Sequence, residues 1–386
     1  MEIKALNVYP IKALRPVPLT SAILTPQGIL HDRTYMLFKV NEDSSLRKLQ
    51  LSSCPQTALF SQEIVSSTEA SSDNNDGTGD TILVKYHIPS PPLVPRHPLQ
   101  ETTLSVPLVP DTAALAPIQI DLHGSPAEAL RMGDPYDAFF SACLGFPTIL
   151  VHIGSGRRPV LGTIAPDSAS STQTSSSSSL FSSITSSPPS FSSPSNAQKP
   201  WLTFTDCAPY LITSSSSLTH PSLTSFSSTT ATTTTPSIMP KMRPNIVVHD
   251  PSEAPFAEDF WAELSLPSSS SSPDAKLLLT ANCGRCASLN VDYATGRPAA
   301  GPEGKLLNAL MKERRVDPGH KYAPVFGRYA FLDVGGAADG GTHPTGIRVR
   351  VGDEVAVTRR NAERTVFDWP LPSAAPKKAN NPVAVA

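Results

Sequence analysis

Long apolar runs, a disulfide pattern and an excess of one charge are all missing from this sequence. No stretch of about 18 apolar residues occurs, so no transmembrane helix is expected. The five cysteines are scattered and odd in number, which argues against a disulfide framework and for a reducing compartment. With 31 basic and 33 acidic residues, the chain gives no reason to expect a nucleic-acid partner. No charged leader with an apolar segment opens the chain, so a soluble, cytoplasmic protein is predicted.

Proline and serine, in contrast, are abundant. The 386 residues include 40 prolines, and tracts of serine, threonine and proline interrupt the chain after residue 163. Such tracts cannot bury enough apolar surface to offset chain entropy. Disorder is therefore predicted for residues 164–199, 214–240 and 266–274 and for the tail 370–386. Because residues 201–212 are compact and apolar, we expect a folded body from which these tracts loop out.

The remainder consists of many short strand patterns and few helices. β-branched and aromatic residues predict strands such as 34–40. Helices are predicted to close at Gly145 and to cover residues 256–264, and alternation over 347–357 predicts a hairpin. This pattern indicates an α+β fold that is predominantly β and barrel-like.

Two cysteines lie between two strand patterns. An apolar run, 277–279, predicts a buried strand, and residues 288–293 predict a second strand. Cys283-Gly-Arg-Cys286 connects them. Thiolates bind soft metals, and a neighbouring cation such as Arg285 favours the thiolate form.

Other interpretations of this Cys-x-x-Cys motif stay open at this point. A structural zinc site needs four ligands, and the sequence lacks a second Cys or His pair. A thioredoxin-type redox pair sits at the start of a helix, whereas strand patterns flank this one. Two inert core cysteines are the remaining alternative.

Four basic residues each follow or precede a strand pattern: Lys12, Arg33, Arg243 and Arg285. Arginine suits bidentate recognition of phosphate, and lysine suits a point-charge contact. As a set they are candidates to converge on one anionic ligand; taken singly, each is more readily explained as a solvated loop charge. Asp206 is either a functional carboxylate or a turn residue. The histidines show no ligand spacing and are predicted to be structural.

The order of several short motifs resembles that of MOSC-domain proteins that carry an N-terminal β-barrel-like domain. The motifs are Tyr9-Pro-Ile-Lys12, His31-Asp-Arg33, Phe204-Thr-Asp206, Arg243-Pro-Asn245, Arg285-Cys286, Val291-Asp292, Thr295-Gly296, Pro324-Val-Phe-Gly327 and the segment 347–355. The pattern is similar to the mitochondrial amidoxime-reducing component and to the C-terminal part of molybdenum cofactor sulfurase. The resemblance implies an N-terminal domain over 1–123 and a MOSC-type β-barrel over 124–369.

The resemblance also implies a molybdenum–pterin cofactor. In the family the cysteine of the Arg-Cys pair ligates molybdenum, which here is Cys286, and Asp206 matches a residue close to the metal. Residues matching cofactor-contacting or neighbouring positions are Lys12, Arg33, Arg243, Asn245 and Arg285. Pyridoxal phosphate, the second cofactor associated with the sulfurase family, has no recognisable lysine site here.

The implied activity is reduction of a small N-hydroxylated substrate with electrons from an external donor protein of the cytochrome b5 type. The chain has no GxGxxG fingerprint and no haem motif of its own. Rival interpretations are a cofactor carrier or sulfur-transfer module, and a β-domain that has lost the cofactor. Ala13 and Cys207-Ala208 stand where the reducing enzymes usually have hydroxyl residues. The targeting or membrane segment of the mitochondrial relatives is not seen, although mitochondrial association stays possible.

Overall fold

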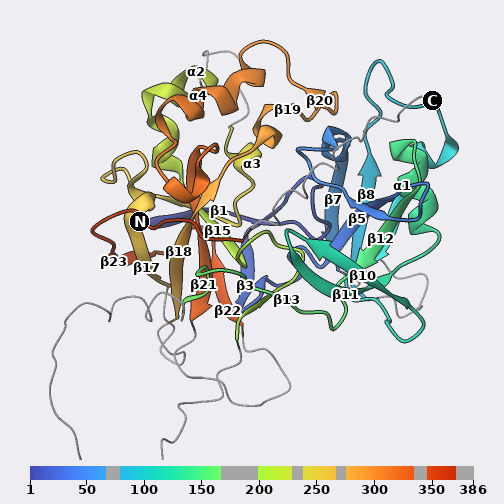
Figure 1. Ribbon diagram of the computed structural model, residues 1–386, viewed down its shortest axis with the longest axis horizontal. Coiled ribbons are helices and arrows are strands. Elements are labelled where there is room, and N and C mark those ends of the chain that lie inside the picture. The colour runs from blue at the N-terminus through green and yellow to red at the C-terminus, as the bar shows by residue number, and fades with distance from the viewer. Residues whose placement is uncertain (67–78, 167–198, 228–237, 267–274, 334–345, 371–386) are drawn as a thin grey trace, which may run out of the picture.

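The computed structural model describes six stretches of the chain, arranged as two β-rich lobes (Figure 1). They are residues 1–66, 79–166, 199–227, 238–266, 275–333 and 346–370. Residues 167–198, 228–237, 267–274 and 371–386 of the segments predicted to be disordered lie outside them. Ile164 and Leu266, at the edges of two of those segments, are buried in the core, so the predicted disorder does not extend to them.

An eight-stranded sheet forms the larger lobe and takes strands from both ends of the chain. Its order is β2-β1-β16-β15-β21-β18-β17-β23. The strands are β1 (Glu2–Val8), β2 (Val17–Leu19), β15 (Tyr210–Ser214), β16 (Ile246–His249), β17 (Trp261–Ser265), β18 (Lys276–Gly284), β21 (Val325–Asp333) and β23 (Ala356–Arg360). β1 pairs antiparallel with β16, and β16 pairs parallel with β15. The N-terminal strand is therefore built into the sheet of the C-terminal unit.

Alternating apolar side chains explain why these strands assemble. Ile3 and Leu6 of β1 share one buried core with Leu277 and Leu279 of β18. The predicted strand 277–279 is thus the centre of the longer strand β18. Register shifts after Leu279 and Asn282 turn its last residues out of regular alternation.

Two further sheets and one helix form the smaller lobe. The sheets are β10-β11-β12-β5-β6 and β7-β8-β9. Their strands are β5 (Tyr35–Val40), β6 (Leu46–Lys48), β7 (Phe60–Val65), β8 (Thr81–Tyr86), β9 (Thr103–Pro107), β10 (Ala116–Leu122), β11 (Ser125–Arg131) and β12 (Thr148–His152). Helix α1 (Tyr136–Leu144) buries Phe139 and Phe140 and ends, as predicted, at Gly145. The expected division after residue 123 falls in the β10–β11 turn, whereas this sheet continues through β12.

Smaller elements connect the lobes and cover the larger one. Three small sheets contain β3 (Ser21–Thr25), β4 (Gly28–Ile29) and β22 (Ile347–Arg350); β13 (Arg158–Pro159) and β14 (Trp201–Leu202); and β19 (Val291–Asp292) and β20 (Arg297–Pro298). The remaining α-helices are α2 (Pro221–Ser227), α3 (Met239–Met242) and α4 (Leu306–Glu313). The 3-10 helices are η1 (Pro55–Leu59), η2 (Pro98–Glu101), η4 (Ser215–Thr219), η5 (Ala257–Phe260), η6 (Ala287–Asn290), η7 (Glu303–Lys305) and η8 (Pro318–His320). In these ranges no helix is both long and apolar enough to cross a membrane. The fold is α+β and predominantly β, as predicted.

Two local predictions are wrong. Residues 256–264 are not an α-helix but the short 3-10 helix η5 followed by β17, whose Trp261 and Leu264 pack into the sheet core. Residues 347–357 are not a hairpin, because β22 pairs with β3 and β23 pairs with β17. In both places a short apolar run suits more than one element, and pairing with distant strands decides the outcome.

The predicted disorder of residues 214–240 is wrong for its first part, which forms η4 and α2. Ser217 Oγ lies 2.7 Å from both carboxylate oxygens of Glu258, and it accepts a hydrogen bond of 2.9 Å from the Phe256 amide. Leu223 is fully buried. Serine here is a buried hydrogen-bonding residue, a role that composition does not reveal.

Candidate functional site

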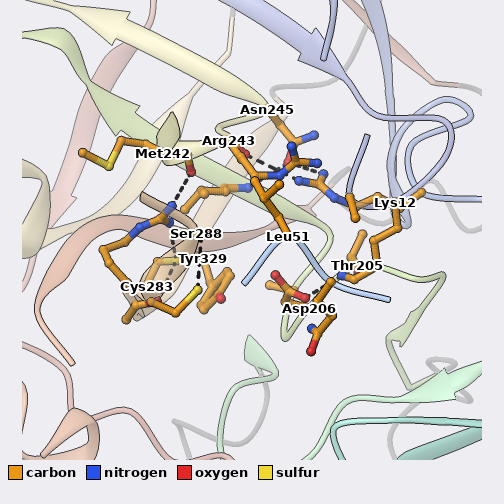
Figure 2. A pocket seen from close by; sticks show the side chains of 18 of the residues that line it. Lys12, Leu51, Thr205, Asp206, Met242, Arg243, Asn245, Cys283, Ser288 and Tyr329 are labelled. Atoms are coloured by element: carbon orange, nitrogen blue, oxygen red, sulfur yellow. Dashed lines mark hydrogen bonds and ion pairs between the residues drawn. The ribbon is translucent and has the colours of Figure 1, made fainter. Parts of the chain in front are cut away.

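A cleft with about 780 Å³ free of protein atoms, part of it open to solvent, lies where the two lobes meet. Loop residues 50–52 of the smaller lobe form one wall. Figure 2 shows Lys12 and Asp206 on one side and Cys283 on the other, with Arg243 between them. The residues expected to form a site all line this cleft: Lys12, Arg33, Asp206, Arg243, Asn245, Arg285 and Cys286.

The two cysteines of the Cys-x-x-Cys motif have different environments. Cys283, near the end of β18, is 3 % exposed and packs in the core, whereas Cys286 is exposed. The Cys286 thiol lies 3.2 Å from the Oγ atom of Ser288. Residues 287–290 form η6, so the strand predicted over 288–293 is wrong except for β19. This tight turn directly after Cys286 leaves its thiol at the cleft.

Arg285 lies beneath the cleft with most of its side chain buried. Its Nη1 atom donates to Cys283 Sγ at 3.1 Å, and Nη2 donates to the Met242 carbonyl at 2.7 Å. Its Nε atom is buried without a hydrogen-bond partner among the described residues. The guanidinium is thus fixed in place while its Nε donor stays unused.

Lys12 and Asp206 form an ion pair of 2.5 Å on one side of the cleft. Burial lowers the pKa of Lys12 to about 8, although the Asp206 charge acts in the opposite direction. Burial would raise the pKa of Asp206, but the Lys12 ammonium and a hydrogen bond with His123 outweigh it and hold that pKa well below its usual range. The Asp206 side chain is 47 % exposed, so an ionised carboxylate faces the opening.

Arg33 and Asn245 belong to a buried network. Arg33 Nη1 donates to Asp32, and also to Asn245 Oδ1 at 3.1 Å. The Asn245 amide donates to Asp32 at 3.0 Å and to the Asn7 carbonyl at 3.3 Å, and its Oδ1 also accepts from the Leu211 amide. Protein partners saturate Asn245, so the geometry favours a role in bracing the site rather than in contacting a cofactor.

The excess positive charge of the cleft therefore comes from Arg243 and Arg285. Lys12 is balanced by Asp206 and Arg33 by Asp32, whereas neither of the other two cations pairs with a carboxylate in the described ranges. Arg243 Nη1 donates to the Leu14 carbonyl at 2.9 Å. Its guanidinium, like that of Arg33, lies 4.4 Å from the centre of the Tyr9 ring.

Part of the backbone strain of the described residues lies at the same place. Ala13, Arg33 and Arg243 all line the cleft and have φ values of 75°, 50° and 56°. A left-handed conformation costs a residue other than glycine about 1–3 kcal/mol and is found preferentially at functional sites. The strain supports the assignment of this cleft as the functional site.

Two sequence profiles match the chain. The MOSC N-terminal beta barrel domain matches residues 1–147, and the MOSC domain matches residues 199–356. The chain is a MOSC-domain protein. No curated protein matches this MOSC-domain protein. MOSC domains are associated with proteins that bind the molybdenum cofactor. Residues from both matched segments line the cleft between the lobes.

The residues present fit such a cofactor. Arg285 Nε and Thr205 Oγ1 are buried polar atoms at the cleft that have no partner in the described ranges, and such atoms are normally satisfied. Arg243 and Arg285 offer positive charge to a phosphate. Cys286 offers an exposed thiol to a soft metal. A phosphorylated sulfur-bearing cofactor would use all three features.

Sequence reasoning missed His123 and Asp32. His123 Nε2 lies 3.4 Å from Asp206 and 3.2 Å from the Gln50 amide nitrogen, although this histidine was expected to be structural only. Asp32 directly precedes Arg33, and only Arg33 of this motif was predicted to be a site residue. No spacing in the sequence indicates these contacts, because they join segments that are distant in the chain. His123 contacts Asp206, and Asp32 contacts Asn245.

Proposed function

We propose that this MOSC-domain protein is a molybdenum cofactor-dependent oxidoreductase that reduces small N-hydroxylated compounds with electrons from a separate protein. The observation that carries the proposal is the exposed Cys286 thiol, which shares one cleft with two uncompensated arginines and the Lys12–Asp206 pair. This set combines a soft metal ligand, an anion site and groups that hold protons.

Each residue has an assigned part in holding the cofactor. When bound, the cofactor would supply two-electron chemistry at its metal. Cys286 would ligate the metal, and Arg243 with Arg285 would hold the phosphate end. The network of Arg33, Asp32 and Asn245 would keep this wall rigid.

The Lys12–Asp206 pair serves the substrate side in this proposal. Reducing an N–OH group breaks the N–O bond, forms N–H and water, and takes up two electrons and two protons. A lysine with a pKa of about 8 exchanges its Nζ proton near neutral pH. The half-exposed Asp206 carboxylate accepts hydrogen bonds from a substrate amine or amidine and orients it. A cytochrome b5-type protein is the expected electron donor, by resemblance.

The test is analysis of protein made in a host that synthesises the cofactor. We expect molybdenum and pterin to copurify and the loaded protein to reduce an amidoxime with an artificial electron donor. Arg243→Ala should retain less pterin after gel filtration, because a charge-assisted hydrogen bond is worth about 1.5–3 kcal/mol. Arg243→Lys, which keeps the charge, should retain more than Arg243→Ala. Because Arg243 also holds Leu14, the unfolding midpoint of each variant must be measured. Full pterin retention by Arg243→Ala contradicts this assignment.

A non-enzymatic carrier or sulfur-transfer module is the second candidate. Ala13 and Ala208 line the cleft with methyl groups, where the resemblance leads one to expect hydroxyl donors. Fewer hydrogen bonds to the cofactor would suit its delivery to another protein. Loaded protein that passes cofactor to an apo-enzyme without reducing an amidoxime would favour this candidate.

A further inference from the structure

A second hollow, on the smaller lobe, carries three cations. Its walls include Lys39 of β5, Arg47 of β6 and Arg297 of β20, and no aspartate or glutamate is among the described residues that line it. Arg47 and Arg297 are exposed, and Lys39 Nζ lies 4.9 Å from the centre of the Phe146 ring. None of the three cations forms an ion pair with a described residue. We call this hollow, with its cations Lys39, Arg47 and Arg297, the basic hollow.

The sheet places two of these cations against each other. Lys39 and Arg47 are directly opposed across the β5–β6 pair, where like charges destabilise a sheet. Asp43, in the turn that joins the two strands, accepts hydrogen bonds from the amide and the hydroxyl of Ser45. It forms no ion pair with Lys39 or Arg47. Burial raises the pKa of the nearby Cys54 thiol, and the charges of Arg47 and Lys39 act in the opposite direction. A fold that keeps this repulsion presents a positive surface to an external anion.

One loop separates the basic hollow from the cofactor cleft. Residues 50–52 line the cleft, and residues 53–56, which lead from this loop into η1, line the hollow. The chain from Cys286 to Arg297 passes over this loop, with Val291 packed against Leu51. Figure 1 shows the β19–β20 hairpin extending from the larger lobe toward the smaller one. The two sites therefore share structural elements on both sides.

We propose that the basic hollow docks the acidic face of the one-electron donor protein. The proposal rests on the proposed function, because cleavage of each N–O bond, with formation of N–H and water, needs two electrons as well as two protons. A one-electron carrier must deliver them in two encounters. Complementary charges at the rim of an interface speed association and set its salt dependence. The exposed positions of Arg47 and Arg297 suit a protein face better than a small enclosed anion.

The test compares two double variants of the loaded, full-length protein. Arg47→Gln/Arg297→Gln removes two charges from the basic hollow, and Arg348→Gln/Arg350→Gln removes two exposed charges from β22 as a matched control. The probe is a soluble, acidic haem protein of the cytochrome b5 type. We expect the hollow variant to raise the KM for this donor by about tenfold and to flatten its salt dependence. The control should match wild type, and amidoxime reduction with a small artificial donor should be unchanged in both.

Equal KM values and equal salt dependence in the hollow variant and wild type would overturn the proposal. Phosphate binding that the hollow variant abolishes, without any effect on the haem protein, would assign the hollow to a small anion and overturn it too. If wild type fails even with the artificial donor, the proposed function is wrong. Docking is then tested by titration calorimetry with the haem protein at low salt. A loss of affinity of about tenfold in the hollow variant alone supports docking, and equal affinities refute it.

Discussion

The Cys283 thiol is held by Arg285, whose Nη1 atom lies 3.1 Å from Sγ. Cys286, three residues later, is exposed at the cleft, with its Sγ atom 3.2 Å from Ser288 Oγ. The two thiols of one Cys-x-x-Cys motif therefore have different environments. Cys283 accepts a hydrogen bond from Arg285, the arginine that we propose to hold the phosphate end of the cofactor, and Cys286 is available as a ligand.

We expect the charge of Lys12 to make cofactor uptake sensitive to alkaline pH. Above its pKa of about 8 the ammonium loses its proton and leaves Asp206 uncompensated, so the cleft becomes less positive. We predict that uptake of the cofactor by apo-protein weakens as the pH rises through about 8. Lys12→Arg should keep its uptake, because a guanidinium stays protonated there. Pterin fluorescence after gel filtration measures this, and an identical decline in both proteins would argue against a role for the Lys12 charge.

Glu258 makes stability depend on pH in the opposite sense to an ordinary surface carboxylate. Burial raises its pKa from 4.5 to about 7, and hydrogen bonding to Ser217 offsets only part of this. Between these two values the folded state holds a proton that the unfolded chain has released, so stability falls as the pH rises. This group should cost up to about 3 kcal/mol across that window.

Glu258→Gln should remove that contribution. Urea unfolding at about pH 5 and about pH 8 should therefore show a smaller fall in stability for Glu258→Gln than for wild type. Substitution of the exposed Glu128 by Gln is the control and should leave the pH dependence as in wild type. A wild-type slope in Glu258→Gln would show that this carboxyl does not titrate in the window.

Ser217 anchors the part of the serine tract that folds. Ser217→Ala deletes the hydrogen bonds to Glu258 and leaves the Phe256 amide without its acceptor. We predict a loss of about 1–3 kcal/mol in the free energy of unfolding. Thr224→Ala, at an exposed position of α2, should change it by less than about 0.5 kcal/mol. Equal effects of the two substitutions in urea unfolding would show that this tract does not depend on Ser217.

The fold class and the cleft residues were predictable because they depend on local chemistry. Short alternating runs predict strands wherever they end up in a sheet. Basic residues and a thiol at strand ends predict a site if those ends converge, and Lys12, Arg243 and Cys286 do line one cleft.

Long-range pairing was not predictable from the same patterns. No local signal shows that β1 joins β16, or that residues 347–357 divide between two sheets. The charge balance of the cleft also depends on contacts between distant segments, such as Lys12 with Asp206. Serine-rich composition gave the wrong outcome at Ser217, because burial of a hydroxyl depends on the partner that reaches it.

X-ray absorption of the molybdenum-loaded protein tests the central claim most directly. Cys286→Ser replaces a soft thiolate by a harder and far less acidic hydroxyl, so the metal should lose one metal–sulfur bond and the protein should lose its reductase activity. Cys283→Ser and Cys207→Ser, at buried positions, should keep the wild-type number of metal–sulfur bonds. If Cys286→Ser keeps the wild-type number while either of the other two variants loses one, Cys286 is not the ligand.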